Sequence, residues 1–205
     1  MNHIIKFNLD FNPSFAIKND LIIKINAWRD ILYLCKLVGY SSQYGGGYGN
    51  LSQRIPNKPE RFVITGSQTG DLKKLTKKHY SIVLQSDFEN NKVAAKGYVK
   101  PSSESMTHAI IYSLYNNVNA VIHVHSPCIF EKAFDLKIPI TDKVGKYGSV
   151  ELVNQIKLLS DQGKLKKNIF AIGSHKDGII AFGKTSEKAG LVVIKYLSKA
   201  LALQK

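Results

Sequence analysis

The chain lacks any long apolar run. No window of its 205 residues approaches 18 consecutive apolar side chains, so we expect no membrane-spanning helix. Its first residues, MNHIIKFNLDFN, contain neither a basic leader nor an apolar stretch ending in small residues, and we expect no secretory signal. No internal repeat or low-complexity linker interrupts the sequence. We therefore expect a single domain over residues 1–205.

Cysteine is equally scarce. Cys35 and Cys128 lie far apart in the sequence, each among apolar residues. This setting is typical of reduced thiols in a protein core, and two such residues cannot form a disulfide framework. Together with the missing signal, the cysteines favour a cytoplasmic location.

Acidic residues and arginine are few. Fifteen acidic residues oppose 29 basic ones, which gives a net charge of +14, but only Arg29, Arg54 and Arg61 are arginines. Such an excess of positive charge could bind a nucleic acid, an anionic lipid surface or an anionic substrate. Proteins that read bases depend on arginine, and no helix-turn-helix, zinc-finger or stacking-strand signature is present. We expect no specific nucleic-acid partner and no membrane; sequence-blind nucleic-acid binding is the alternative that the charge suggests.

Helical and strand patterns alternate along the chain, which predicts an α/β domain. The glycine-rich segment YGGGYGN is expected to be a loop without regular structure. Asn19 or Asp20 is the expected cap of the first helix, and Gly39 suits its end. Helices are predicted at residues 20–38, 101–115, 126–134, 147–163 and 186–203, and strands at 51–55, 61–65, 81–87, 92–98, 119–125, 168–175 and 177–183.

Two of the six histidines stand two residues apart in the apolar run NAVIHVHSP. Residues i and i+2 of a strand point to the same face, so His123 and His125 should project side by side. Imidazole nitrogens placed in this way can bind one cation, as zinc requires. Two ordinary histidines are the alternative, although two imidazoles on a buried face without a partner would be unfavourable.

A metal site needs a third ligand. His175 follows the predicted strand NIFAIGSH beside the turn KDG, and sites often form where strands meet loops. His79, in a polar segment, and His108, on a predicted helix, are competing candidates. Cys128 is near the pair in sequence and thiolates bind zinc, but its apolar neighbourhood favours an inert core thiol.

Glu104 is the candidate for proton transfer. It falls in the first turn of the helix predicted from PSSESMTHAIIYSLY, capped by Ser102 or Ser103. Acidic residues are common there because they complement the helix dipole. Beside a bound cation, however, a carboxylate can move protons at a carbon or oxygen that the metal acidifies. The helix start and its two serines could also receive a phosphate.

Four segments occur in an order and spacing that resemble a known family: GNLSQR, KPSSESMTH, AVIHVHSP and IGSHKDGIIAFGKT. The chain resembles the class II aldolase/adducin family, which includes fuculose-phosphate aldolase and related epimerases and dehydratases of sugar phosphates. The resemblance covers roughly residues 18–203. It implies a three-layer αβα fold with a central, mostly antiparallel sheet flanked by helices.

The resemblance also implies the site residues. It places a divalent metal, usually Zn²⁺ but otherwise Mn²⁺, Co²⁺ or Fe²⁺, on His123, His125 and His175, and the acid/base role on Glu104. Ser67 is an alternative to Thr69, because the turn TGSQTG is longer than usual in the family. Tyr147 is the nearest candidate for the family's proton-donating tyrosine. The implied phosphate-binding residues are Asn50, Thr69, Gly70, Ser102 and Ser103.

The implied activity is a metal-dependent aldolase or lyase reaction. Its substrate would be a small phosphorylated sugar or a related hydroxy-carbonyl compound, cleaved through a metal-stabilised enediolate. An epimerase or a dehydratase of the same family is the alternative reaction. A non-catalytic, adducin-like interaction module is the alternative class, although the three histidines and Glu104 favour an enzyme. The resemblance implies a homotetramer.

Overall fold

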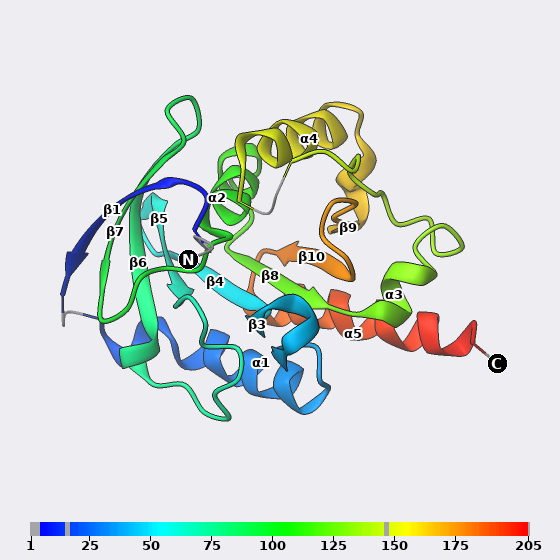
Figure 1. Cartoon of the computed structure of the whole chain (residues 1–205), viewed down its shortest axis with the longest axis horizontal. Helices are drawn as coiled ribbons and strands as arrows, with labels where there is room; N and C mark the ends of the chain where they lie inside the picture. The colour runs from blue at the N-terminus through cyan, green and yellow to red at the C-terminus, as the bar shows by residue number, and fades with distance from the viewer. Residues whose placement is uncertain (1–4, 15–16, 146–147, 205) are drawn as a thin grey trace.

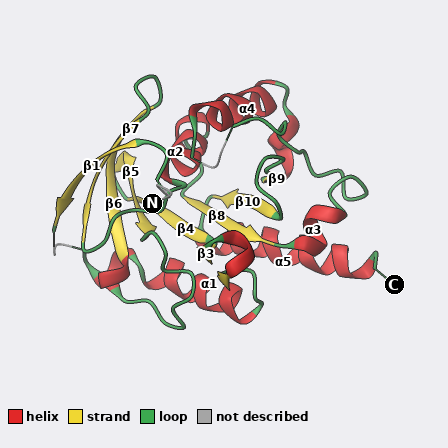
Figure 2. Ribbon diagram, in the orientation of Figure 1, coloured by secondary structure: helices red, strands yellow, loops and turns green. Residues whose placement is uncertain are grey.

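The computed structural model describes residues 5–14, 17–145 and 148–204. No helix in these ranges is both long and apolar enough to cross a membrane. Figures 1 and 2 show a sheet between two groups of helices. Its elements are β1 (Asn8–Pro13), α1 (Ile23–Leu34), β2 (Gly39–Ser41), β3 (Gly46–Tyr48), β4 (Asn50–Ile55), β5 (Lys58–Thr65), β6 (Tyr80–Asp87), β7 (Lys92–Gly97), α2 (Ser105–Leu114), β8 (Ala120–His125), α3 (Pro127–Glu131), α4 (Val150–Asp161), β9 (Ile169–Ala171), β10 (Gly178–Gly183) and α5 (Ser186–Ala202).

The main sheet has eight strands in the order β1-β7-β6-β5-β4-β8-β10-β9. Every described pair in it is antiparallel except β1 with β7, which is parallel. The expected fold class, a mostly antiparallel sheet flanked by helices, is confirmed. Strand β8 lies between β4 and β10, so its backbone is paired on both edges. Its side chains are buried on both faces of the sheet.

Each face of the sheet carries its own apolar core. Ile122 and Val124 of β8 belong to the core that α1, α3 and α5 cover. Val121 belongs to the core that α2 and α4 cover. Because side chains alternate along a strand, His123 and His125 share the face of Val121. Both histidines therefore point to the side of the sheet where α2 begins.

The first helix is shorter than its apolar pattern predicts. α1 ends at Leu34, and Lys36 takes a left-handed conformation with φ of 57°. The expected caps are wrong: Asn19 and Asp20 lie in a separate 3-10 turn, and Gly39 begins β2. Cys35 follows the last turn and is exposed, and Cys128 is half-buried. The expectation of a core thiol is thus wrong for Cys35, because the apolar period of the segment continues beyond the helix. Cys128 packs against the core without being fully buried in it.

The glycine-rich segment is more regular than expected. Gly46–Tyr48 forms β3, which pairs antiparallel with β2. The hairpin packs closely against Gly70, where only glycine leaves enough room. A Cβ atom on Gly70 would lie 2.6 Å from the carbonyl oxygen of Tyr48. Strand β1 was not predicted at all. Its side chains are mostly exposed, so the segment carries a weak apolar alternation.

A glycine in α5 allows α1 to pack closely against that helix. Gly190 of α5 is buried, and a Cβ atom there would overlap the indole ring of Trp28. A mid-helix Gly→Ala change normally stabilises a helix by about 1 kcal/mol. We expect Gly190→Ala to lower the free energy of unfolding by about 1–3 kcal/mol instead, because overpacking outweighs helix propensity.

Urea unfolding followed by circular dichroism measures this difference. Ser198→Ala is the control, since Ser198 is exposed on the same helix. That substitution should be neutral or slightly stabilising. A Gly190→Ala protein more stable than the wild type would show that the contact with Trp28 does not restrain α1.

Candidate metal centre and anion pocket

Strand pairing assembles the first half of the site. In the register of β8 with β4, His123 lies opposite Asn50, and in the register with β10, His125 lies opposite Gly178. The side-chain amide nitrogen Nδ2 of Asn50 is 3.1 Å from Nδ1 of His123. Asn50, His123 and His125 are all buried. Two strands distant in sequence thus bring an amide and two imidazoles to one place.

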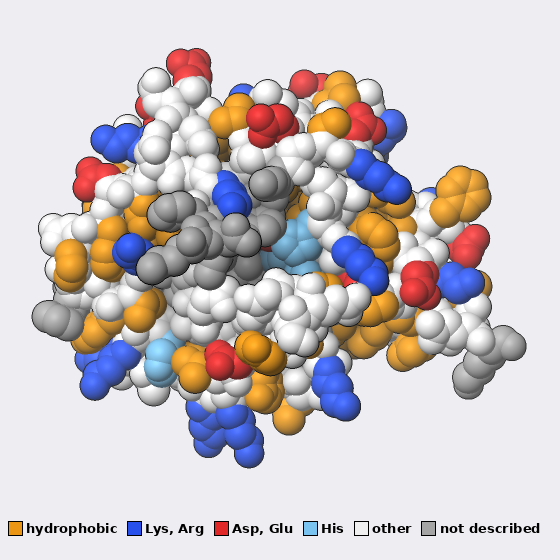
Figure 3. Space-filling view, in the orientation of Figure 1, with side chains coloured by type: hydrophobic (Ala, Val, Ile, Leu, Met, Phe, Trp, Pro, Cys, Tyr) orange, Lys and Arg blue, Asp and Glu red, His pale blue; other side chains and the backbone are white. Residues whose placement is uncertain are grey.

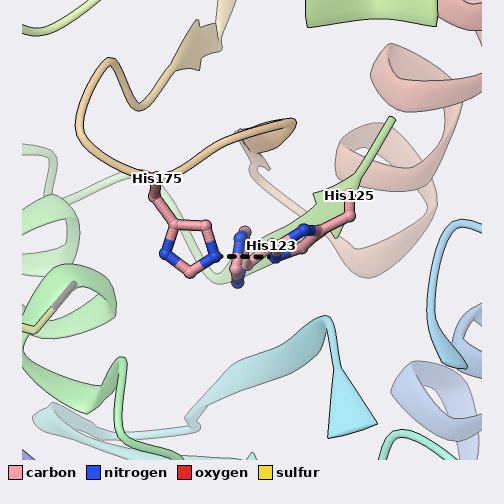
Figure 4. Close-up of side chains that lie close together, drawn as sticks. All are labelled: His123, His125 and His175. Atoms are coloured by element: carbon pink, nitrogen blue, oxygen red, sulfur yellow. Dashed lines mark hydrogen bonds between the residues drawn. The ribbon is translucent and has the colours of Figure 1, made fainter. Parts of the chain in front are cut away.

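His175 completes the histidine group, although not from a strand end. β9 stops at Ala171, and His175 sits in the turn before β10, where its N–H donates to Ile172 O at 3.1 Å. Its Nε2 lies 2.8 Å from Nε2 of His125 (Figure 4). The three rings each offer a nitrogen, and these atoms lie within 4.8 Å of one another. Three imidazoles from two segments 50 residues apart therefore converge on one point.

The competing third ligands lie elsewhere. His79 accepts a hydrogen bond from the backbone N–H of Thr76 at 2.9 Å. Nδ1 of His108 lies 2.7 Å from the Ser52 hydroxyl inside the core. Cys128 is not in the histidine group either. Among the described residues, only His123, His125 and His175 form such a group.

The histidines are held in the form that binds metals. Burial holds the pKa of His123 well below its usual 6.5 and lowers that of His125 to about 3 and that of His175 to about 4. All three imidazoles are consequently neutral at pH 7, which leaves ring lone pairs available. Nε2 of His123 is buried and has no hydrogen-bond partner among the described residues. A donor set of three neutral imidazoles fits zinc and several other divalent ions.

Glu104 lies directly beside this group. It occupies the cap position before α2, one residue earlier than the predicted first turn, and neither serine caps the helix. Its Oε1 is 3.4 Å from Nδ1 of His123 and 3.6 Å from Nδ1 of His175. Burial raises the pKa of the carboxyl to about 8. Glu104 is therefore protonated and the rings neutral in metal-free protein, so these contacts are not ion pairs.

The predicted phosphate-binding residues border the same pocket. Asn50, Thr69, Gly70, Ser102 and Ser103 line it together with Glu104 and the three histidines. The pocket encloses about 540 Å³ of space between atoms, part of it open to solvent. Figure 3 shows histidine atoms at the bottom of a hollow near the middle of one face. One wall of the pocket thus consists of imidazole and phenol rings, and the other, here called the hydroxyl wall, offers hydroxyls and glycine backbone.

Hydrogen bonds shape the hydroxyl wall. The Thr69 hydroxyl donates to Gly66 O at 2.8 Å, and the Ser102 hydroxyl accepts from the N–H of Glu104 at 3.2 Å. Ser67 also lines the pocket, so the choice between Ser67 and Thr69 stays open. The second bond links the hydroxyl wall to Glu104, because Ser102 lines the pocket and accepts from the Glu104 backbone.

Tyr44 is a pocket residue that the sequence analysis missed. Its ring lies 4.2 Å from that of His125, centroid to centroid, and its hydroxyl donates to Oδ2 of Asp177 at 2.6 Å. Burial and this bond raise the pKa of Tyr44. The bond links the glycine-rich segment to the turn that carries His175. The sequence signal that could have identified Tyr44 is its place directly before three glycines. Tyr147, the tyrosine predicted in its stead, lies outside the described residues.

A family model described as "Class II Aldolase and Adducin N-terminal domain" matches residues 29–204. The chain belongs to the class II aldolase and adducin family. L-fuculose phosphate aldolase of Methanocaldococcus jannaschii is 26% identical over 164 residues, covering 76% of this chain and 83% of that protein. Methylthioribulose-1-phosphate dehydratase of a Sulfurihydrogenibium species is 26% identical over 145 residues, covering 71% of this chain and 60% of that protein.

Solved structures of class II aldolases share the fold. An L-fuculose 1-phosphate aldolase superposes with a TM-score of 0.67 at 20% identity, covering 92% of this chain and 87% of that one. The L-fuculose-1-phosphate aldolase of Thermus thermophilus superposes with a TM-score of 0.64 at 16% identity, covering 91% of this chain and 94% of that one. At such identities the likeness extends to the fold alone.

The histidine group predicts how metal binding responds to mutation. We expect His123→Ala to lower zinc affinity at least about tenfold, because a three-ligand site then keeps two ligands. Zinc competition with a chromophoric chelator, using protein purified without a histidine tag, measures the affinity. His79→Ala is the control, since His79 lies outside the group. Equal affinities in the two variants would exclude this metal site.

The buried imidazoles also predict acid lability of the metal-free protein. Burial lowers the pKa of His108 to about 3, as it lowers that of the three clustered histidines. A lowered folded-state pKa gives stability above pH 6.5 that is lost as the pH falls toward the folded value. Glu104 has the opposite sign, since its stabilisation is lost as the pH rises through about 8.

Four imidazoles outweigh one carboxyl, so the free energy of unfolding should fall from pH 6.5 toward pH 4. Urea unfolding in the presence of a chelator, repeated at several pH values, measures the slope. His108→Gln should flatten it by about one proton, because one buried imidazole is gone. A free energy of unfolding independent of pH in this window would contradict neutral, buried histidines.

Proposed function

We propose that this protein is a divalent-metal-dependent lyase of the class II aldolase type, acting on a small phosphorylated sugar or a related hydroxy-carbonyl compound. The observation that supports it best is the position of Glu104, whose Oε1 lies within 3.6 Å of ring nitrogens of two of the three clustered histidines. A proton-transferring carboxyl, a metal-ligand group and an anion-binding wall then share one pocket.

The three histidines would hold the metal, with zinc as the first choice and Mn²⁺, Co²⁺ or Fe²⁺ as others. When bound, such an ion supplies Lewis-acid stabilisation of the negative charge that develops on a substrate oxygen. Burial holds His123, His125 and His175 neutral, so each ring keeps one nitrogen lone pair for the metal.

Glu104 would take up or return the proton at the reacting carbon or oxygen. Its carboxyl is buried, so its protonation state responds strongly to nearby charge: a cation favours the ionised form, and burial alone favours the acid. The carboxyl can thus serve as a base at the start of a turnover and as an acid at its end.

The hydroxyl wall would bind the phosphate group of the substrate. Asn50, Thr69, Gly70, Ser102 and Ser103 would supply the donors, and binding the remote phosphate orients the reacting end toward Glu104. The net charge of +14 attracts anionic substrates from solution. The proposal includes a homotetramer, the assembly expected from the family.

An epimerase or dehydratase reaction is the second candidate, because the dehydratase relative is as identical to this chain as the aldolase, at 26% each, over 71% and 76% of the chain. All three reactions need one carboxyl beside a polarised substrate, and Glu104 would serve each. Product analysis separates the aldolase from the dehydratase. An aldolase cleaves the substrate into two carbon fragments, and a dehydratase releases water and leaves the carbon skeleton whole.

The test uses zinc-loaded protein with fuculose 1-phosphate and with methylthioribulose 1-phosphate, the two substrate types named by the relatives. We expect turnover of one of them, and we expect Glu104→Gln to lower kcat by about 10²–10⁴-fold, the usual contribution of general acid–base catalysis. Zinc content should stay unchanged, since the amide replaces no ligand.

Glu89→Gln is the matched control, because Glu89 is exposed in the turn between β6 and β7 and should leave kcat unchanged. Unaltered turnover by Glu104→Gln would remove Glu104 from the chemistry. Zinc-loaded wild-type protein that transforms neither compound and no other sugar phosphate would favour a non-catalytic, adducin-like module.

A further inference from the structure

One face of α1 is bonded to the backbone of a loop. Asn26, Arg29 and Tyr33 lie three and four residues apart, so they share one side of the helix. Their side chains donate to carbonyl oxygens between residues 69 and 75: Asn26 Nδ2 to Leu75 at 3.3 Å, and the Tyr33 hydroxyl to Asp71 at 3.4 Å. The loop has no strand or helix of its own in this range, so α1 restrains it from one side.

Arg29 makes most of these bonds. Its Nη1 donates to Lys73 O at 3.0 Å, and its Nη2 donates to Gly70 O at 3.0 Å, to Thr69 O at 3.4 Å and to Leu72 O. The side chain is only 1% exposed, and it lies 3.6 Å from a half-exposed Asp30 carboxylate. Burying a guanidinium is unfavourable unless its donors are satisfied. Here backbone carbonyls accept from both Nη atoms, and only Nε is buried without a partner among the described residues.

The bonded carbonyls determine where the opposite N–H groups point. A peptide unit is planar and trans, so its C=O and N–H point in opposite directions. The carbonyl of Thr69 faces Arg29, and the N–H of Gly70 belongs to the same peptide unit. A Cβ atom added to Gly47 would lie 3.0 Å from that nitrogen, so the Gly70 amide lies beside Gly47, and both glycines line the pocket.

We propose that Arg29 is a positioning residue of an anion site: it holds the turn at Thr69 and Gly70 so that the turn presents its N–H groups to a phosphate monoester. Arg29 does not touch the phosphate, because it is buried behind the turn. The proposal rests on the proposed function for its substrate class, a sugar phosphate. Donors fixed before binding cost little reorganisation, which favours tight phosphate binding.

The planar fork of arginine is central to this role. A guanidinium offers five N–H donors in fixed geometry, whereas an ammonium offers three donors on a flexible stem. Arg29→Lys keeps the charge and loses the fork, and Arg29→Met loses both. If positioning matters, both substitutions weaken phosphate binding. If only the positive charge matters, lysine retains it.

Arg54 provides a matched control. It too donates to backbone carbonyls, from Nε to Val118 at 2.9 Å and from Nη2 to Tyr112 at 2.9 Å and Tyr115 at 3.1 Å. It does not line the pocket. Arg54→Lys therefore disturbs the same kind of bond at a distance from the candidate anion site.

The experiment titrates zinc-loaded protein with inorganic phosphate by isothermal calorimetry, with zinc content and thermal unfolding checked for every variant. We expect the dissociation constant to rise about tenfold or more in Arg29→Lys and Arg29→Met, and to stay unchanged in Arg54→Lys. Wild-type affinity in Arg29→Lys, or an equal loss in Arg54→Lys, would overturn the proposal. If the Arg29 variants do not fold, Tyr33→Phe replaces them, and a rise of about two- to threefold is expected.

Substrate preference gives a second readout, which a general loss of stability would not change. For Arg29→Lys, kcat/KM should fall for the sugar phosphate that is turned over and stay constant for the same sugar without phosphate. Phosphate binding that depends on Arg29, in a protein that transforms no sugar phosphate, would support this inference and refute the lyase. Turnover with phosphate binding independent of Arg29 would do the opposite.

Discussion

The site depends on the pairing of β8 with β4 on one side and β10 on the other. This pairing sets His123 opposite Asn50 and places the turn that carries His175 over His125. A shift of one residue in the register of β8 would turn both of its histidines to the opposite face of the sheet. The apolar residues that alternate with them prevent this, since Ile122 and Val124 are buried in the other core.

Burial then determines the chemistry of the pocket. A buried carboxyl and buried imidazoles resist charge. Without a cation Glu104 therefore keeps its proton at pH 7, and the histidines are neutral. The hydroxyl wall differs, because the polar groups it offers are backbone amides and hydroxyls rather than charged side chains. The charged side chain of Arg29 lies buried behind the turn and bonds to its carbonyls.

Sequence patterns predicted strong elements well and weak ones poorly. The apolar stripe of α5 and the buried run of β8 were evident, because packing requires those periods. β1 escaped notice since most of its side chains are exposed, and β3 because glycine carries no pattern. The end of α1 was misjudged, because Lys36 adopts a left-handed conformation that no residue preference announces.

The sequence by itself determined that His123 and His125 share a face, since strand geometry allows nothing else, and its motifs pointed to the family. Only the tertiary structure decided that His175 and not His79 or His108 joins them, and that Tyr44 borders the pocket. It also placed Arg29 behind the turn at Thr69 and Gly70. The physical reason is that these contacts link segments 40 or more residues apart, whose approach depends on sheet order and helix packing rather than on local preference.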